Sequence, residues 1–266
     1  MSGLMQEVMT AVDAGMRERL LGLCDAMAAH LRGLRDPKRR VSETVHETRK
    51  LGKALRGGMT LVGMPKASVR AVATVARMLA GQRDAVSRLK TWQRLNWDEG
   101  PQGQDPAVQA VGAMLEKLAH SAGRRPPVEA VAWAEARLGE ARSLLERHSE
   151  AALQAALPHG LHRLHRRVHK RLRLLGLRRR HAPAFHEGRK ALKAWLGAQA
   201  LLGETPDDAC VKLAELLGDE NDLSALETWL NARGFSKGMA PGVWSRVSVR
   251  HKQLRVGILE ESLSVR

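Results

Sequence analysis

Two copies of one basic motif stand 140 residues apart in the sequence. Residues 46–54 read HETRKLGKA and residues 186–194 read HEGRKALKA, so six of the nine positions match. Imidazole, guanidinium and ammonium side chains donate hydrogen bonds and carry positive charge, which suits them to bind phosphate oxygens. The motif therefore predicts an anion-binding site in each half of the chain.

On a helix, the cations of the first copy fall on one face. With 3.6 residues per turn they lie within about 120° of arc, opposite an apolar stripe that begins at Leu51. Ser42 as N-cap and Pro183 at the first helical position would place each histidine near a helix N-terminus, which favours anions. The alternative is that each histidine pairs with an acid, Asp84 or Asp222, and orients a helix junction. The candidate anion-binding residues are His46, Arg49, Lys50, Lys53 and Arg56 in the first copy and His186, Arg189, Lys190 and Lys193 in the second.

A further basic stretch precedes the second copy. Apolar residues recur at steps of three and four from Leu161 to Leu175, which predicts an amphipathic helix with an almost wholly cationic opposite side. The tract at residues 178–180, three consecutive arginines, is typical of nucleic-acid or heparin-like binding, a pattern with many false positives. Further candidate anion-binding residues are Arg163, Arg166, Lys170 and Arg173 in this stretch and Arg250 in the last segment.

Helices must position these residues, and the whole chain favours helices. Gly and Pro residues, among them Pro158 and Gly160, separate segments of roughly 15 to 30 residues with apolar positions three and four apart. We expect about eight to ten amphipathic helices and an all-α fold, because no segment alternates as a strand does. A weaker match of residues 78–84 to residues 216–222 supports a duplication, with halves at 1–125 and 126–266.

The charge of the chain indicates an anionic partner. The 266 residues include 44 Lys and Arg against 28 Asp and Glu, a formal net charge of +16. Such a surface suits nucleic acid, a membrane surface or another phosphate polymer. Six Trp, two Phe and no Tyr disfavour a binder of single-stranded nucleic acid, because such proteins stack bases on exposed aromatic rings.

Several other classes of protein are disfavoured. The chain has no G-x-x-x-x-G-K-[ST] loop, no H-E-x-x-H and no C-x-x-C. Lys50 and Lys190 stand where the second histidine of a zinc motif would be, so we expect no metal ion. The absence of the other motifs predicts no cofactor. Cys24 and Cys210 are predicted to be reduced core residues, and neither a signal peptide nor a membrane span is indicated. These features predict a soluble, cytoplasmic protein.

The duplicated residues resemble the conserved histidine α-helical domain family, called CHAD. In that family each half opens a helix with His, followed by Arg three residues later and a basic residue seven residues later. The matching residues are His46, Arg49 and Lys53 in the first half and His186, Arg189 and Lys193 in the second. The second family motif, L-G-x-x-x-D, is similar to residues 79–84 and 217–222, with Ala80 in place of the first glycine. The resemblance covers roughly residues 30–260.

The resemblance implies two pseudo-symmetric four-helix-bundle repeats, residues 1–125 and 126–266, that share a central basic groove or pore. It also implies non-enzymatic binding of inorganic polyphosphate, with polyphosphate granules as one place where the protein would be found. Polyphosphate has about one negative charge per unit and no bases, so spaced cations without stacking rings suit it. A basic helical nucleic-acid-binding protein that uses residues 163–180 is the alternative. A phosphohydrolase is less favoured, because no paired carboxylate accompanies the cations.

Overall fold

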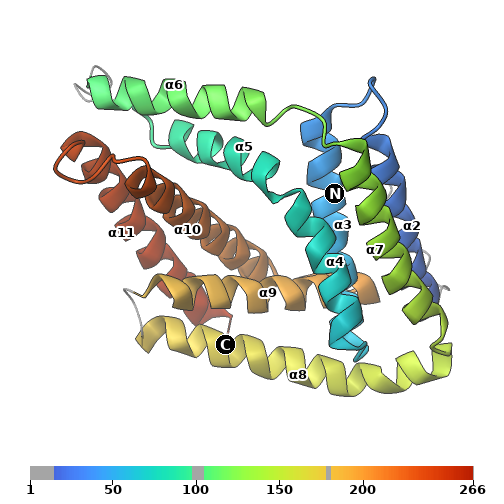
Figure 1. The fold of residues 1–266 in the computed structure, drawn as a ribbon. Coiled ribbons are helices and arrows are strands. Elements are labelled where there is room, and N and C mark those ends of the chain that lie inside the picture. Colours follow the sequence, from blue (N-terminus) through green and yellow to red (C-terminus); the bar gives the residue numbers. More distant parts are fainter. Residues whose placement is uncertain (1–14, 98–104, 178–180, 266) are drawn as a thin grey trace. The chain divides into compact units, whose positions relative to one another are not determined.

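The computed structural model describes residues 15–97, 105–177 and 181–265, except for the side chains of residues 82 and 83. Within these ranges it contains ten α-helices and no strand, so the expected all-α fold is confirmed (Figure 1). The helices are α2 (Met16–Gly33), α3 (Val41–Leu61), α4 (Lys66–Met78), α5 (Ala80–Gln93), α6 (Pro106–Ser121), α7 (Val128–Glu146), α8 (Glu150–Leu177), α9 (Ala182–Leu202), α10 (Asp208–Ala232) and α11 (Pro241–Ser264). No described helix is both long enough and apolar enough to cross a lipid bilayer.

The helices form two compact units, each assembled from separate stretches of the chain. Unit 1 comprises residues 1–83, 123–168 and 193–206, and unit 2 comprises residues 84–122, 169–192 and 207–266. Helices α8 and α9 each contribute residues to both units. The compact units therefore differ from the expected halves 1–125 and 126–266, and the division into two repeats stays a prediction.

Unit 1 is built around the apolar faces of α2, α3, α4 and α7. Helix α3 packs against α2 and α4, and the apolar stripe opposite its cations is buried as expected. The buried residues of that stripe are Leu51, Leu55, Met59 and Val62. Cys24 lies in the same core, and burial raises the pKa of its thiol to about 12, so it stays an unreactive neutral group.

Unit 2 has its own core between α5, α6, α10 and α11. Trp92 and Trp97 stack with ring centroids 4.2 Å apart, and the Trp97 indole donates to the Trp92 carbonyl oxygen at 2.9 Å. Asp207 caps α10 by accepting hydrogen bonds from the amides of Ala209 and Cys210. Cys24 and Cys210 are both free and buried, which confirms the prediction of reduced core residues.

The start of α8 differs from the sequence expectation. The break expected at Pro158 does not occur, because α8 begins at Glu150 and continues through the proline. Glu150 accepts hydrogen bonds from the amides of Met16 and Arg17, each at 2.7 Å. The turns of α8 that precede Pro158 are therefore anchored to the first turn of α2. Gly160 allows α8 to touch α3, since a Cβ atom there would lie 1.8 Å from the Leu61 carbonyl oxygen. Gly160 is therefore needed for the close contact between α8 and α3, and it does not end the helix.

The helix starts expected at the two motifs both need correction. Ser42 is not the N-cap of α3, because the helix begins at Val41 and Arg40 occupies the N-cap position without a side-chain cap. Pro183 is the second residue of α9, within the first turn where proline is tolerated. His186 therefore lies in the second turn of α9, and His46 lies in the second turn of α3.

Candidate functional site

The first basic motif lies on α3, on the side opposite the core of unit 1. His46 and Lys53 are exposed, and Arg49, Lys50 and Arg56 are half-buried. Arg49 donates to the carbonyl oxygen of Ala76 near the end of α4, at 2.8 Å. A cation at this place satisfies one of the last carbonyls of α4 and is stabilised by the helix dipole.

Arg163 of α8 plays a similar part at the end of α3. It donates to the carbonyl oxygen of Thr60 at 2.5 Å, and Thr60 follows Arg56 by one turn. The contact is possible because Gly160 brings α8 against the last turn of α3. In unit 1, Arg49 therefore binds the C-terminal end of α4, and Arg163 binds the C-terminal end of α3.

Arg56 is the least satisfied cation of this group. Its Nε is buried and has no hydrogen-bond partner among the described residues. Burial lowers the pKa of its guanidinium, and the positive charge of Arg77 lowers that pKa further. Arg77 of α4 was not singled out from the sequence, since it lies outside the repeated motif. A bound anion near these two positive charges would relieve their repulsion.

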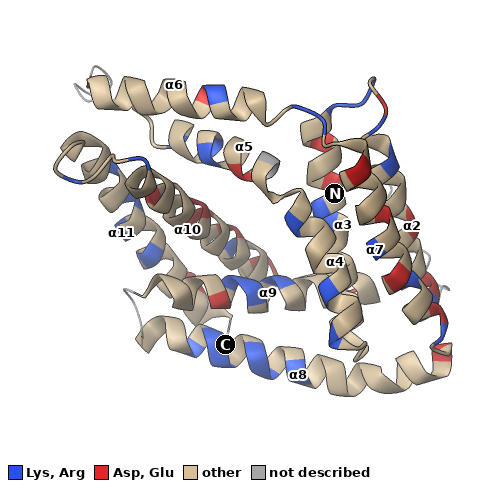
Figure 2. Ribbon diagram, viewed as in Figure 1, with Lys and Arg blue, Asp and Glu red and all other residues tan. Residues whose placement is uncertain are grey.

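Helix α8 carries a row of exposed cations, which we call the α8 cation row: Arg163, Arg166, Lys170 and Arg173. Steps of three, four and three residues place them on one face over about 15 Å. Apart from the bond of Arg163 to a carbonyl, none forms a hydrogen bond or ion pair with another described residue. The only acid of α8 is Glu150, in its first turn. Figure 2 shows the Lys and Arg positions of α8 gathered in its second half.

The opposite side of α8 is apolar as expected. Leu164, Val168, Leu172 and Leu175 are buried, and Leu161 is half-buried. Helix α8 is therefore amphipathic in the way its sequence predicts, with burial on one side and unneutralised charge on the other.

The second motif lies on α9, where unit 2 holds His186 through a chain of hydrogen bonds. The 2.6 Å contact between His186 Nδ1 and Asn221 Oδ1 places the proton on Nδ1, because an amide oxygen only accepts. Asn221 donates to Asp222 at 3.3 Å, and Ser87 donates to the other oxygen of Asp222 at 3.0 Å. The histidine partner is therefore Asn221 rather than an acid, and Asp222 acts one step further along the chain.

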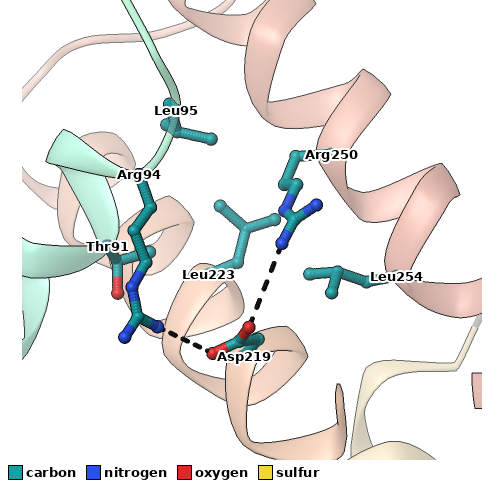
Figure 3. Close-up of a pocket in the computed structure, with 7 residues that line it drawn as sticks. All are labelled: Thr91, Arg94, Leu95, Asp219, Leu223, Arg250 and Leu254. Carbon is teal, nitrogen blue, oxygen red and sulfur yellow. Dashed lines mark hydrogen bonds and ion pairs between the residues drawn. The ribbon is translucent and has the colours of Figure 1, made fainter. Parts of the chain in front are cut away.

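Two acids of α10, Asp219 and Glu220, pair with arginines of unit 2. Asp219 binds Arg94 at 2.9 Å and Arg250 at 3.9 Å (Figure 3). Glu220 is buried and accepts two hydrogen bonds from Arg255. Thr91, Leu95, Leu223 and Leu254 complete the small pocket around Asp219. Arg250 is thus a predicted site residue whose charge is already shared with a carboxylate.

The two motif copies share one local contact. Lys50 lies 3.9 Å from Glu47, and Lys190 lies 3.0 Å from Glu187, each pair three residues apart on its helix. Glu187 is also 3.6 Å from Arg171. The repeated glutamate therefore pairs with the repeated lysine in both copies, which reduces the charge that Lys50 and Lys190 can offer a ligand.

The predicted site residues divide between the two units. Residues in unit 1 are His46, Arg49, Lys50, Lys53, Arg56, Arg163, Arg166 and Lys193. Residues in unit 2 are Lys170, Arg173, His186, Arg189, Lys190 and Arg250. A common groove lined by both motifs stays a prediction. The arginine tract at 178–180 lies outside the described residues.

Among the described residues, no group of three or more His, Cys, Asp or Glu side chains has the arrangement to hold a metal ion. The acids near the cations instead bind arginine, lysine or serine side chains, as Asp219, Glu187 and Asp222 do.

Comparisons with known proteins identify a matching family model and two similar folds. The model of the CHAD domain family matches residues 18–231. PptA from Streptomyces chartreusis is similar in fold, with a TM-score of 0.68 and 16% sequence identity over 92% of this chain and 96% of that chain. The CHAD domain from the plant Ricinus communis gives a TM-score of 0.59 and 18% identity over 96% and 94%. No curated protein gives a significant match.

Proposed function

The chain belongs to the CHAD domain family, and on that premise we propose that it binds inorganic polyphosphate without converting it chemically. The family is linked to polyphosphate. The observation that carries the proposal is the α8 cation row, in which Arg166, Lys170 and Arg173 are exposed and have no carboxylate partner among the described residues. Most structural cations on a protein surface have acids interspersed between them, and this row has none.

The chemistry of the row suits a phosphate chain. Arginine can bind two phosphate oxygens with its fork of donors, and lysine contributes a compact positive charge. Helix α8 has no Phe, Tyr or Trp, so the row offers no ring on which a base could stack. A polymer with a negative charge on every unit and no bases can pair with each cation of the row and needs no aromatic ring. Binding should release counterions and weaken steeply as salt rises.

Two further features would contribute to the same function. A bound anion would reduce the repulsion between the positive charges of Arg56 and Arg77. His186 keeps its Nε2 for a ligand, because Nδ1 is bound to Asn221. The proposal therefore assigns charge to the α8 cation row and directed hydrogen bonds to the motif residues.

The first test is competition for labelled long-chain polyphosphate at roughly 0.15 M salt. Unlabelled polyphosphate, duplex DNA and RNA are compared as competitors at matched phosphate concentration. We expect polyphosphate to compete far better than either nucleic acid. Equal competition per phosphate would replace the proposal with a general nucleic-acid-binding surface.

The second test places the site on α8. The double variant K170Q/R173Q removes two charges of the α8 cation row, and R137Q/R147Q removes two exposed charges from α7 and its end as the matched control. We expect the first variant to bind polyphosphate at least about tenfold more weakly than the control, because each lost cation removes a phosphate contact. Its affinity should also depend less steeply on the salt concentration. Equal affinities of the two variants would show that net charge alone attracts the polymer.

The third test concerns catalysis. Polyphosphate is incubated with the protein and Mg²⁺, and its chain length and the released orthophosphate are measured. We expect both to stay unchanged. Shortening that follows the protein concentration would contradict the non-enzymatic proposal.

A further inference from the structure

Helix α11 exposes a row of apolar side chains that the polyphosphate proposal does not use. Val249, Val256 and Leu263 are 53%, 47% and 59% exposed, and they stand seven residues apart. Seven residues make about two turns, so all three lie on one face of the helix. Of the eight large apolar side chains exposed in the described residues, three therefore lie along one line.

This apolar line faces away from the core of unit 2. The buried residues of α11 are Val243, Trp244, Val247, His251, Leu254, Ile258 and Ser262. At 100° per residue, the centre of that buried set and the centre of the apolar line are about 160° apart. Single exposed valines are ordinary on protein surfaces. A seven-residue repeat of them is the pattern by which one helix packs on another.

The charges beside the apolar line have a matching symmetry. Lys252 lies four residues before Val256, about 40° to one side of the line, and Glu260 lies four residues after it, about 40° to the other side. Both side chains are exposed, and neither forms a hydrogen bond or ion pair with another described residue. Val249 and Leu263 stand seven residues to either side of the same valine. Val256 is therefore the centre of both the apolar and the charged pattern.

We propose that α11 is a homodimer interface, in which the helices of two copies pack antiparallel about a two-fold axis at Val256. Such an axis sets Val256 against itself and Val249 against Leu263 of the second copy. It also brings Lys252 level with Glu260 of the second copy, so opposite charges meet at both ends. A parallel pairing would instead set each lysine beside the other lysine and each glutamate beside the other glutamate.

The association is measured by analytical ultracentrifugation over a series of protein concentrations, without polyphosphate. A salt concentration of about 0.3 M screens the repulsion between two chains that each carry +16. We expect a concentration-dependent dimer. A monomer throughout the series overturns the proposal. Because no polyphosphate is present, this result is independent of the proposed function.

The centre of the interface is tested with V256E. This variant sets two carboxylates against each other at the axis, and we expect the dimer to dissociate at least about tenfold more readily. The matched control is M239E, which places the same acid at a side chain that is 76% exposed and lies outside α11. A dimer that withstands V256E, or that M239E weakens as much, overturns the assignment to α11.

The antiparallel register is tested by exchanging the charges. K252E and E260K should each weaken the dimer, because each sets like charges level with one another. The double variant K252E/E260K restores opposite charges at both ends and should return the association to near that of the unaltered protein. Failure of the double variant to recover association overturns the antiparallel arrangement. Circular dichroism checks that each variant keeps its helix content.

Discussion

Replacing Arg56 with methionine is expected to stabilise the fold and weaken polyphosphate binding at the same time. The Arg56 guanidinium is half-buried, its Nε has no hydrogen-bond partner among the described residues, and the positive charge of Arg77 lowers its pKa further. Methionine keeps an unbranched apolar stem of similar reach and removes the buried donor and the charge. The two effects therefore have one origin, a cation placed for a ligand rather than for the fold.

The size of the stability effect follows from the environment of Arg56. A fully buried donor without a partner costs about 1–3 kcal/mol, and we take a value at or below the lower end of that range, about 0.5–1 kcal/mol, because the side chain is only half-buried. In a chain of this size that gain raises the Tm by about 1–3 °C. Loss of one charged contact to phosphate, taken as about 1 kcal/mol, weakens polyphosphate binding by about fivefold.

The assay compares Arg56→Met with Arg70→Met, which removes the same charge from an exposed position on α4. Scanning calorimetry gives the Tm, and fluorescence titration with labelled polyphosphate at fixed salt gives the affinity. Only Arg56→Met should raise the Tm, and it should weaken binding more than Arg70→Met does. A lower Tm for Arg56→Met, or equal affinities of the two variants, would refute the reasoning.

Three further predictions concern packing, pH and thiol reactivity. Gly160→Ala should lower the free energy of unfolding by about 2–3 kcal/mol in urea titrations, because its Cβ would meet the Leu61 carbonyl oxygen at 1.8 Å; an unchanged midpoint would contradict this contact between α8 and α3. Burial lowers the pKa of His251 from 6.5, although Glu220 and Glu227 oppose the shift and Arg255 adds to it. As the pH falls, the unfolded chain therefore binds a proton at this histidine before the folded chain does. The stability that neutral His251 contributes is fully present above about pH 6.5 and is lost as the pH falls towards the lowered pKa. Urea unfolding at two pH values on either side of this window should show a smaller loss in His251→Gln than in the unaltered protein, and equal losses would exclude His251 as the cause. Since burial raises the pKa of Cys24 to about 12, an aromatic disulfide reagent should modify Cys24 in the Cys210→Ser protein only after unfolding, and rapid modification of the native protein would show that the core admits solvent.

Much of the candidate site could be predicted from local patterns alone. The steps of three and four in α8 predicted a buried stripe and an exposed cationic side, and Leu164, Val168 and Leu172 are indeed buried. The same reasoning predicted the buried side of α3 and the helical fold. Periodicity succeeds here because an amphipathic helix must bury its apolar face whatever it packs against. The repeated motif also led to the family, which the match over residues 18–231 shows.

Local patterns failed where a side chain interacts with residues that are distant in the sequence. The partner of His186 is Asn221, 35 residues away, and an acid was the partner that charge alone suggested. The charge of Arg77 lowers the pKa of Arg56, although Arg77 lies outside the motif. Ser42 is not the N-cap that its residue type indicated, because α3 begins one residue before it. The first two depend on where two helices meet, which composition and spacing leave open.

The sequence by itself determined that the chain is helical, strongly basic and built with cations on the outer faces of its helices. Only the tertiary structure decided which of those cations are neutralised. The carboxylates of α10 bind Arg94, Arg250 and Arg255, while Arg166, Lys170 and Arg173 of α8 meet no acid in the described residues. The physical reason is that the charge of a residue is local, whereas its neutralisation depends on groups within a few ångströms in space, which folding brings from distant parts of the chain.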